Sequence, residues 1–214
     1  MAMIDTVLIL GNSKKFILES KKIFKNSKIV VVPWRDCEKF ISNERDFKKM
    51  KISTCIVCGY NHKSALFEYS KYYKLNVENP FLFLKNNIPN SATIIYIDTL
   101  QDSKNITFSR YKFAKRQLAN MLTTTFKKFL LVSVPLVVNK KNKADINSDI
   151  FSKFIFNFMI SIGIIKTINM KKVGKLISYL LRTMPRSQKN DIKGIFLKVP
   201  RFQFIDRVLR LTCG

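Results

Sequence analysis

Tyr111 and Lys115 are the two residues of this chain whose types and spacing are best suited to proton chemistry. They lie in the run SRYKFAK, at positions 109–115. On a helix, residues four apart project from the same face, one turn from each other. An ammonium group beside a phenol favours the phenolate, so the tyrosine could exchange a proton near neutral pH. Thr99, at the end of the preceding apolar run, can add a hydroxyl group.

The chain carries a large excess of positive charge. Its 39 Lys and Arg residues stand against 14 Asp and Glu residues, which gives a formal net charge of +25. Such a field favours anionic partners: nucleotides, phosphorylated lipids, anionic membranes or nucleic acid. The positive charge is spread along the chain, and the sequence has no helix-turn-helix, zinc-finger or RNA-binding aromatic motif. We therefore expect an anionic small-molecule substrate and no specific nucleic-acid partner.

The hydropathy pattern predicts neither a secretory signal nor a membrane span. The N-terminal apolar stretch 6–10 is too short for a signal core, and Lys14 and Lys15 follow it closely. The longest uncharged apolar stretch is 154–165. It is shorter than the about 20 residues that a bilayer-spanning helix needs. We therefore expect a cytoplasmic protein.

The four cysteines predict structural thiols rather than a metal site. Cys55 and Cys58 form a Cys-x-x-Cys pair, but they fall within a predicted strand, on which residues three apart point to opposite faces. No second pair is present to complete a zinc site. Free thiols of this kind are typical of a reducing cytoplasm.

Short apolar runs alternate with helical patterns through the first two-thirds of the chain. The runs predict strands at 6–10, 28–32, 54–58, 92–97 and 129–138, and the intervening patterns predict helices at about 13–24, 34–49, 64–86 and 108–128. Continuous apolar strands that alternate with helices predict a parallel sheet covered on both faces. With right-handed crossovers this is a doubly wound, Rossmann-like α/β fold. Ligands bind such sheets outside the carboxyl ends of the strands, where Gly11, Gly59, Thr99 and Asn139 fall.

The pattern changes after residue 139. We therefore predict a nucleotide-binding core over 1–139 and a short, mainly helical C-terminal region over 140–214, packed on the same domain. Helices are predicted over 151–162 and 171–182. In the tail, 199–211, apolar and arginine residues interleave as in an amphipathic basic helix. This tail either packs on the core or associates peripherally with an anionic membrane at its inner face.

These landmarks resemble, in order, the extended branch of the short-chain dehydrogenase/reductase superfamily, which includes nucleotide-sugar epimerases and dehydratases. VLILG at 7–11 is similar to the first family strand and glycine, and CIVCG at 55–59 to the strand that leads to the nicotinamide. LNV at 75–77 resembles the helix that carries a structural asparagine. IYIDT at 95–99 resembles the strand that ends in the catalytic Ser/Thr. With Tyr111 and Lys115, the resemblance covers about residues 5–182.

The resemblance implies a role for each matching residue. Tyr111 would be the general acid/base, Thr99 would polarise the substrate oxygen, and Lys115 would favour the phenolate and bind the nicotinamide ribose. Asn76 would be structural or would hold a water molecule. The cofactor, NAD or NADP, would be lined by Gly11, Ser13, Lys14, Arg35, Asp36, Gly59, Asn76 and Lys115. The resemblance also implies a homodimer that pairs through the long helices 64–86 and 108–128.

The glycine-rich loop departs from the family pattern. Lys14 and Ile17 occupy the positions of the second and third glycines, which allow approach to the pyrophosphate and close helix–strand packing. Lys14 can instead offer a cation to a phosphate, and the helix N-terminus offers its dipole. After the second strand, Arg35 suits a 2′-phosphate and Asp36 a ribose hydroxyl. The choice between NAD and NADP therefore stays open.

Two functions are compatible with this pattern. The first is an NAD(P)-dependent oxidoreductase or epimerase of short-chain type. It would act on a nucleotide sugar or a lipid-linked sugar in bacterial surface polysaccharide synthesis. The second is a catalytically degenerate relative that serves as a binding or regulatory partner, which the altered glycine loop favours.

Overall fold

A parallel six-stranded sheet lies at the centre of the molecule, in the strand order β2-β1-β3-β4-β5-β8. The computed structural model describes residues 5–41, 47, 49–61, 64, 67–99, 110–134, 136–138, 154, 157–158, 160–161, 167–183 and 195–196. The strands of this sheet are β1 (Thr6–Leu10), β2 (Lys28–Val32), β3 (Ile52–Val57), β4 (Thr93–Thr99), β5 (Lys128–Val134) and β8 (Ile195–Phe196).

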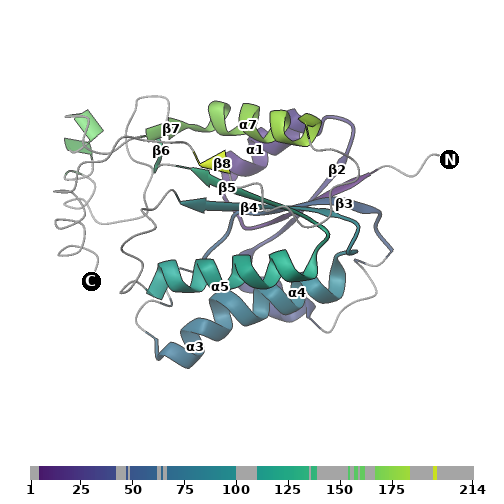
Figure 1. Ribbon diagram of the computed structural model, residues 1–214, viewed down its shortest axis with the longest axis vertical. Coiled ribbons are helices and arrows are strands. Elements are labelled where there is room, and N and C mark those ends of the chain that lie inside the picture. The colour runs from purple at the N-terminus through teal and green to yellow at the C-terminus, as the bar shows by residue number, and fades with distance from the viewer. Residues whose placement is uncertain are drawn as a thin grey trace.

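Helices cover both faces of the sheet, as Figure 1 shows. On one face lie α1 (Lys14–Ile23) and α7 (Met170–Thr183), which contact each other. The opposite face carries η1 (Trp34–Phe40), α3 (Tyr69–Tyr73), η3 (Lys74–Glu78), α4 (Asn79–Asn87) and α5 (Arg110–Thr125). The predicted doubly wound, Rossmann-like architecture is therefore confirmed.

Alternating strand residues build two separate cores. Val7 and Ile9 of β1 belong to the apolar cluster beneath α1 and α7. Leu8 and Leu10 belong to the cluster beneath α4 and α5. Because side chains alternate along a strand, a strand covered on both faces must be apolar at every position. This is why Val7 to Leu10 reads as an unbroken apolar run in the sequence.

The described cysteines are buried or partly buried and unpaired. Cys55 lies in the cluster beneath α4 and α5 and Cys58 against the other cluster, so the two thiols occupy opposite faces as predicted. Burial raises the pKa of Cys37 and of Cys58 to about 12. Among the described residues no group of His, Cys, Asp or Glu could hold a metal ion.

Three predicted elements differ from the structure. The strand predicted at 129–138 is two strands: β5 ends at Val134, and β6 (Leu136–Val138) pairs with β7 (Thr167–Asn169) in a second sheet. The backbone at Pro135 cannot donate a ladder hydrogen bond, which accounts for a break there. The helix predicted at 34–49 is a 3₁₀ helix that ends at Phe40. The helix predicted from residue 64 begins at Tyr69.

The helical segment from Tyr69 to Asn87 contains a π turn. Residues Lys74–Glu78 form this turn, and Pro80 follows within the first positions of α4. π turns of this kind often occur at functional sites, because the extra residue re-aims the side chains around it.

No helix in the described part of the chain is long and apolar enough to cross a bilayer. The tail at 199–211 and most of the helix predicted at 151–162 lie outside the described residues. Within the C-terminal region, α7 packs on α1 and β8 extends the main sheet beside β5.

Candidate active site

The strand order reverses at β1, which has β2 on one side and β3 on the other. In doubly wound sheets this reversal opens a crevice at the carboxyl ends of the strands, where ligands bind. Gly11 follows β1 and Gly59 lies just beyond β3, and their backbones touch. A Cβ atom on Gly11 would lie 2.8 Å from the Gly59 nitrogen, and Gly11 has a φ of 137°. Gly11 is thus required both by its conformation and by this close approach.

Trp34 fills the space beside Gly59. It is the first residue of η1, separated from β2 by Pro33, and is 4% exposed. A Cβ atom on Gly59 would lie 2.5 Å from Cε3 of the indole ring. Within the described part of the chain, the buried indole N–H has no hydrogen-bond partner. Sequence reasoning did not single out Trp34, although a lone tryptophan placed shortly after a strand end was a usable signal.

The loop after Gly11 leads into the N-terminus of α1. Ser13 is the N-cap residue, and its side chain makes no capping hydrogen bond. Lys14 is exposed at the first position of the helix. Ile17, at the position of a family glycine, packs against the core beneath α1. The first-turn N–H groups therefore remain available to an anion.

The two residues expected to read the cofactor ribose are Arg35 and Asp36, and both lie in η1. Arg35 is exposed. The Asp36 carboxylate accepts a hydrogen bond from the Lys39 ammonium at 2.7 Å. Asp36 is therefore engaged within its own helix in this structure.

Lys115 lies at the carboxyl end of β4 and is only 7% exposed. Its ammonium group donates to the Ile97 carbonyl at 2.8 Å and lies 4.0 Å from the Asp98 carboxylate. It also lies 4.9 Å from the centre of the Tyr96 ring. A buried cation requires such partners, because desolvation alone would cost several kcal/mol. The position of this ammonium group is therefore fixed by β4.

Tyr111 lies one turn before Lys115 on the same face of α5. The Lys115 ammonium is 5.9 Å from the centre of the Tyr111 ring. The predicted pair thus comes together at the carboxyl edge of the sheet. Thr99 is the last residue of β4, opposite Val134 of β5. The Thr99 side chain lies outside the described part of the structure.

Tyr60 connects the two ends of the crevice. Its ring packs edge-on against Tyr111, with 4.5 Å between ring centres and an interplanar angle of 73°. Its other neighbour is Trp34, at 6.5 Å. The Tyr60 and Tyr72 hydroxyl groups share a hydrogen bond. Burial raises the pKa of Tyr60, and the bond to Tyr72 adds to the rise. Sequence reasoning also missed this tyrosine, which follows Gly59.

Asn76 lies in the π turn and ties the loop after β3 to the helix. Its Oδ1 accepts from the Asn61 backbone N–H at 2.9 Å. Its Nδ2 donates to the Ser64 hydroxyl at 2.7 Å and to the Tyr72 carbonyl at 3.2 Å. Both amide protons are thus engaged with protein groups. This geometry favours the structural role over the alternative of holding a water molecule.

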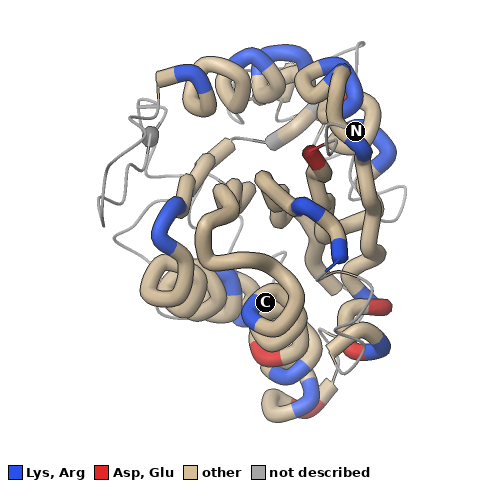
Figure 2. The backbone as a smooth tube through the Cα atoms, turned by 90° about the vertical axis from the view of Figure 1, so that its right-hand side faces the viewer, with Lys and Arg blue, Asp and Glu red and all other residues tan. Residues whose placement is uncertain are grey.

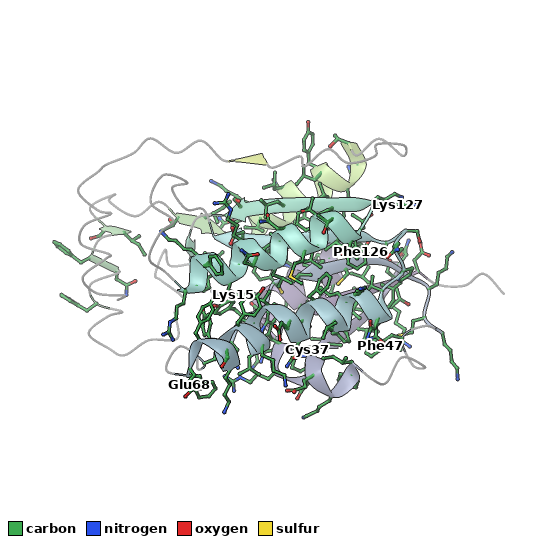
Figure 3. The ribbon with its side chains drawn as sticks, turned by 60° about the horizontal axis from the view of Figure 1, so that its bottom comes forward. Lys15, Cys37, Phe47, Glu68, Phe126 and Lys127 are labelled. Carbon is green, nitrogen blue, oxygen red and sulfur yellow. The ribbon has the colours of Figure 1, made fainter. Side chains whose placement is uncertain are left out.

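Figure 3 shows the side chains of the face that α3, α4 and α5 cover. Cys37 and Phe47 lie on the side of α4, in the core that Trp34 joins. Lys15 lies at the same end of the molecule as the first turns of α3 and α5, and its ammonium nitrogen is buried. The carboxyl edge thus gathers Lys14, Lys15 and Lys115, which would favour an anionic ligand.

The doubly wound parallel sheet places the chain in the Rossmann-like class of folds, with Tyr111 and Lys115 of α5 beside the carboxyl end of β4. No protein-family model matches this chain, and no curated protein matches its sequence. Its fold is nevertheless similar to solved structures of sugar-nucleotide enzymes.

Two of these are dTDP-4-dehydrorhamnose reductases. The one from Bacillus anthracis, in complex with NADP, has a TM-score of 0.64 and 14% identity, over 100% of this chain and 82% of that chain. The one from Clostridium acetobutylicum has a TM-score of 0.63 and 16% identity, over 97% and 80%. The Bordetella bronchiseptica enzyme WbmH, in complex with NAD+, has a TM-score of 0.59 and 12% identity, over 98% and 81%. These likenesses support the Rossmann-like fold of the chain.

Proposed function

We propose that this protein is an NAD(P)-dependent oxidoreductase or epimerase of short-chain type that acts on a sugar conjugate. The observation that carries the proposal is the buried Lys115 ammonium beside Tyr111 at the carboxyl edge of the sheet. Chance placement of a Tyr-x-x-x-Lys pair would leave the lysine in solvent, because lysine is almost never fully buried without a reason. The solved structures of similar fold contain NADP or NAD+, which supports the same cofactor class here.

A dinucleotide would contact this edge of the sheet at three places, and the residues present fit it at two of them. The tight Gly11 turn and the uncapped N-terminus of α1 suit a pyrophosphate, with Lys14 beside it. Lys115 suits the nicotinamide ribose. At the third point, next to Gly59, the Trp34 indole covers the backbone that an adenosine would approach. Cofactor binding would therefore require the indole to turn away from Gly59.

The chemistry of the two residues follows from their positions. A bound nicotinamide dinucleotide supplies a hydride or accepts one. In the direction of reduction, the Tyr111 hydroxyl gives its proton to the substrate carbonyl oxygen as that oxygen gains charge. In the direction of oxidation, the phenolate takes the proton of the substrate hydroxyl. Lys115 places a positive charge 5.9 Å from the centre of the Tyr111 ring in both directions.

The substrate class rests on charge and on the neighbouring structures. The net charge of +25 favours an anionic substrate. Two of the similar structures are named as dTDP-4-dehydrorhamnose reductases. We infer a nucleotide sugar or a lipid-linked sugar, used in bacterial surface polysaccharide synthesis.

The proposal is tested with purified protein and a set of nucleotide-linked keto sugars. NADH or NADPH oxidation is followed at 340 nm, with Tyr111→Phe as the matched control. We expect turnover with the native chain and its loss in the variant, with unchanged circular dichroism. Equal rates in the two proteins would overturn the assigned role of Tyr111.

A second candidate function is that of a degenerate relative that binds partners without catalysis. The observations that favour it are Ile17 in the glycine loop and Trp34 over Gly59. Calorimetry separates the two functions. Absence of NAD(H) and NADP(H) binding at millimolar concentration, together with no copurified cofactor by mass spectrometry, would support the degenerate protein and contradict the enzyme.

A further inference from the structure

The outer surface of α1 and α7 is strongly basic. Each helix carries four cationic residues, and Glu19 is the one acidic residue in either. In Figure 2 these helices lie at the top, where blue segments dominate, whereas red segments gather mainly among the helices at the bottom. The two helices contact each other and cover the same face of the sheet, so their cations lie on one side of the molecule. All of these cationic residues are exposed except Lys15, whose ammonium nitrogen is buried.

The single acidic residue on this surface is already neutralised. The Glu19 carboxylate pairs with the Lys22 ammonium at 3.1 Å, and its side chain is only 13% exposed. It turns inward against Gly174 of α7, where a Cβ atom would lie 2.5 Å from Glu19 Cγ. The face therefore presents cations to solvent without an exposed carboxylate among them.

The exposed positions form a line on each helix. On α1 the line runs through Lys14, Leu18, Lys21 and Lys22, and on α7 through Lys171, Lys175, Tyr179 and Arg182. Spacings of three and four place these residues on one helical face. Leu18 is 59% exposed and Tyr179 is 61% exposed, so each line of cations carries one large apolar or aromatic side chain in solvent.

The opposite helical layer has a different character. It contains four acidic residues, Asp36, Glu38, Glu68 and Glu78, and two of them pair with lysines of the same layer: Lys39–Asp36 at 2.7 Å and Lys74–Glu38 at 4.0 Å. The described carboxylates of the two helical layers are therefore unequally exposed. The asymmetry points to a partner for the α1–α7 face.

We propose that the outer surface of α1 and α7 docks on a membrane rich in anionic phospholipid. Juxtamembrane cations are each attracted by about 1 kcal/mol to an anionic lipid surface. Exposed leucine and tyrosine side chains add contacts in the interfacial region, where such groups are favoured. A nucleic acid would use the cations but gain nothing from Leu18, which is why a bilayer fits better. The proposal does not depend on the enzymatic function.

Vesicle cosedimentation with the full-length chain tests this surface. The vesicles are phosphatidylcholine alone or phosphatidylcholine with phosphatidylglycerol. The variant Lys21→Glu/Lys175→Glu changes one exposed cation on each helix. The control Lys85→Glu/Arg116→Glu makes the same change in net charge on the exposed side of α4 and α5. We expect binding to the anionic vesicles only, weakened at least about tenfold in the first variant and much less in the control.

A second variant tests the apolar contribution. Leu18→Ser/Tyr179→Ser keeps every charge, so we expect it to lose the part of the binding that survives at 0.5 M salt. Equal weakening by the two charge variants would overturn the proposal, because it would show attraction by net charge or by another segment. The proposal would also be overturned if the chain left anionic vesicles unbound, or if it bound a single-stranded RNA through these residues and not the vesicles.

Discussion

The two ends of the crevice differ in how ready they are for a ligand. At the β4–α5 end, the Lys115 ammonium is held at 2.8 Å by the Ile97 carbonyl, with Tyr111 one turn away. At the β1–β2–β3 end, Ile17 is built into the core and the Trp34 indole covers Gly59. Under the proposed function, the end that would transfer the proton is organised in advance, whereas the end that would hold the nucleotide is partly closed.

Under the proposed function, this difference means that the two ends of the site depend on different parts of the fold. The chemistry end depends on a helix and a strand that the core positions anyway, because α5 packs on the sheet through Leu118 and Leu122. The nucleotide end depends on a loop and on the first residues after β2, which can change without disturbing the sheet. Each end can therefore be perturbed by itself.

The largest effect is expected at the chemistry end. Replacing Tyr111 by Phe removes the hydroxyl group and should lower turnover by about 100- to 10,000-fold. The phenyl ring of the variant keeps the packing contact with Tyr60, so the melting temperature should change little. NAD(P)H oxidation and thermal denaturation, measured side by side, check both statements. Lys115→Met should also lower turnover.

The second-largest effect is expected at Trp34, whose indole covers Gly59. Trp34→Ala removes a buried ring and should lower the free energy of unfolding by about 3–5 kcal/mol. It should also strengthen NADPH binding, since the covered Gly59 becomes accessible. Trp34→Phe serves as the matched control, with a smaller stability loss and weaker cofactor gain. Weaker binding in Trp34→Ala than in the native chain would show that the indole contacts the nucleotide rather than covering its place.

A smaller effect is expected at Asn76, which ties the loop after β3 to the helix. Asn76→Ala leaves the Asn61 N–H and the Tyr72 carbonyl without their partner, which should cost about 1–3 kcal/mol of unfolding free energy. Asn76→Asp keeps the acceptor for Asn61 but buries a carboxylate opposite the Tyr72 carbonyl, so it should destabilise the fold at least as much as Asn76→Ala. Chemical denaturation of the three proteins checks this order.

The smallest effect concerns the buried thiols at the two ends. Burial raises the pKa of Cys37 and of Cys58 to about 12 from an ordinary 9.0. The folded state therefore holds these protons more tightly than the unfolded state above pH 9. The stability they contribute is complete below pH 9 and is lost as the pH rises toward 12. In a Cys213→Ser chain, thiol reagents at pH 8 should react only after denaturant is added.

Much of the fold follows from patterns that are local in the sequence. The strands were predictable because a strand buried on both faces is apolar at each position, as in Val7 to Leu10. The pairing of Tyr111 with Lys115 was predictable because helical spacing alone places them on one face. The break after Val134 was not, because a proline within an apolar run is compatible with either a strand end or a strand edge.

The remaining features depend on contacts between distant segments. Trp34 meets Gly59, and Tyr60 meets Tyr111, across separations that no periodicity encodes. Asp36 and Lys39 are three residues apart in the sequence. Only the 3₁₀ helix η1 shows that they pair, so that the carboxylate expected at the cofactor ribose is already engaged. The sequence therefore predicted the placement of Tyr111 and Lys115 better than the surroundings of Gly59.

The π turn at Lys74–Glu78 makes the effect of a deletion depend on where it falls. The turn holds one residue more than an α-helix would over the same path. Deleting that residue would restore an ordinary α-helix over this path and would leave Phe83, Leu84 and Asn87 in the core that they fill. The deletion would instead re-aim the side chains of the turn, among them Asn76, which holds the Asn61 backbone. A deletion within α4 should have the opposite effect, because it would turn the residues after it by about 100° and shift them by about 1.5 Å.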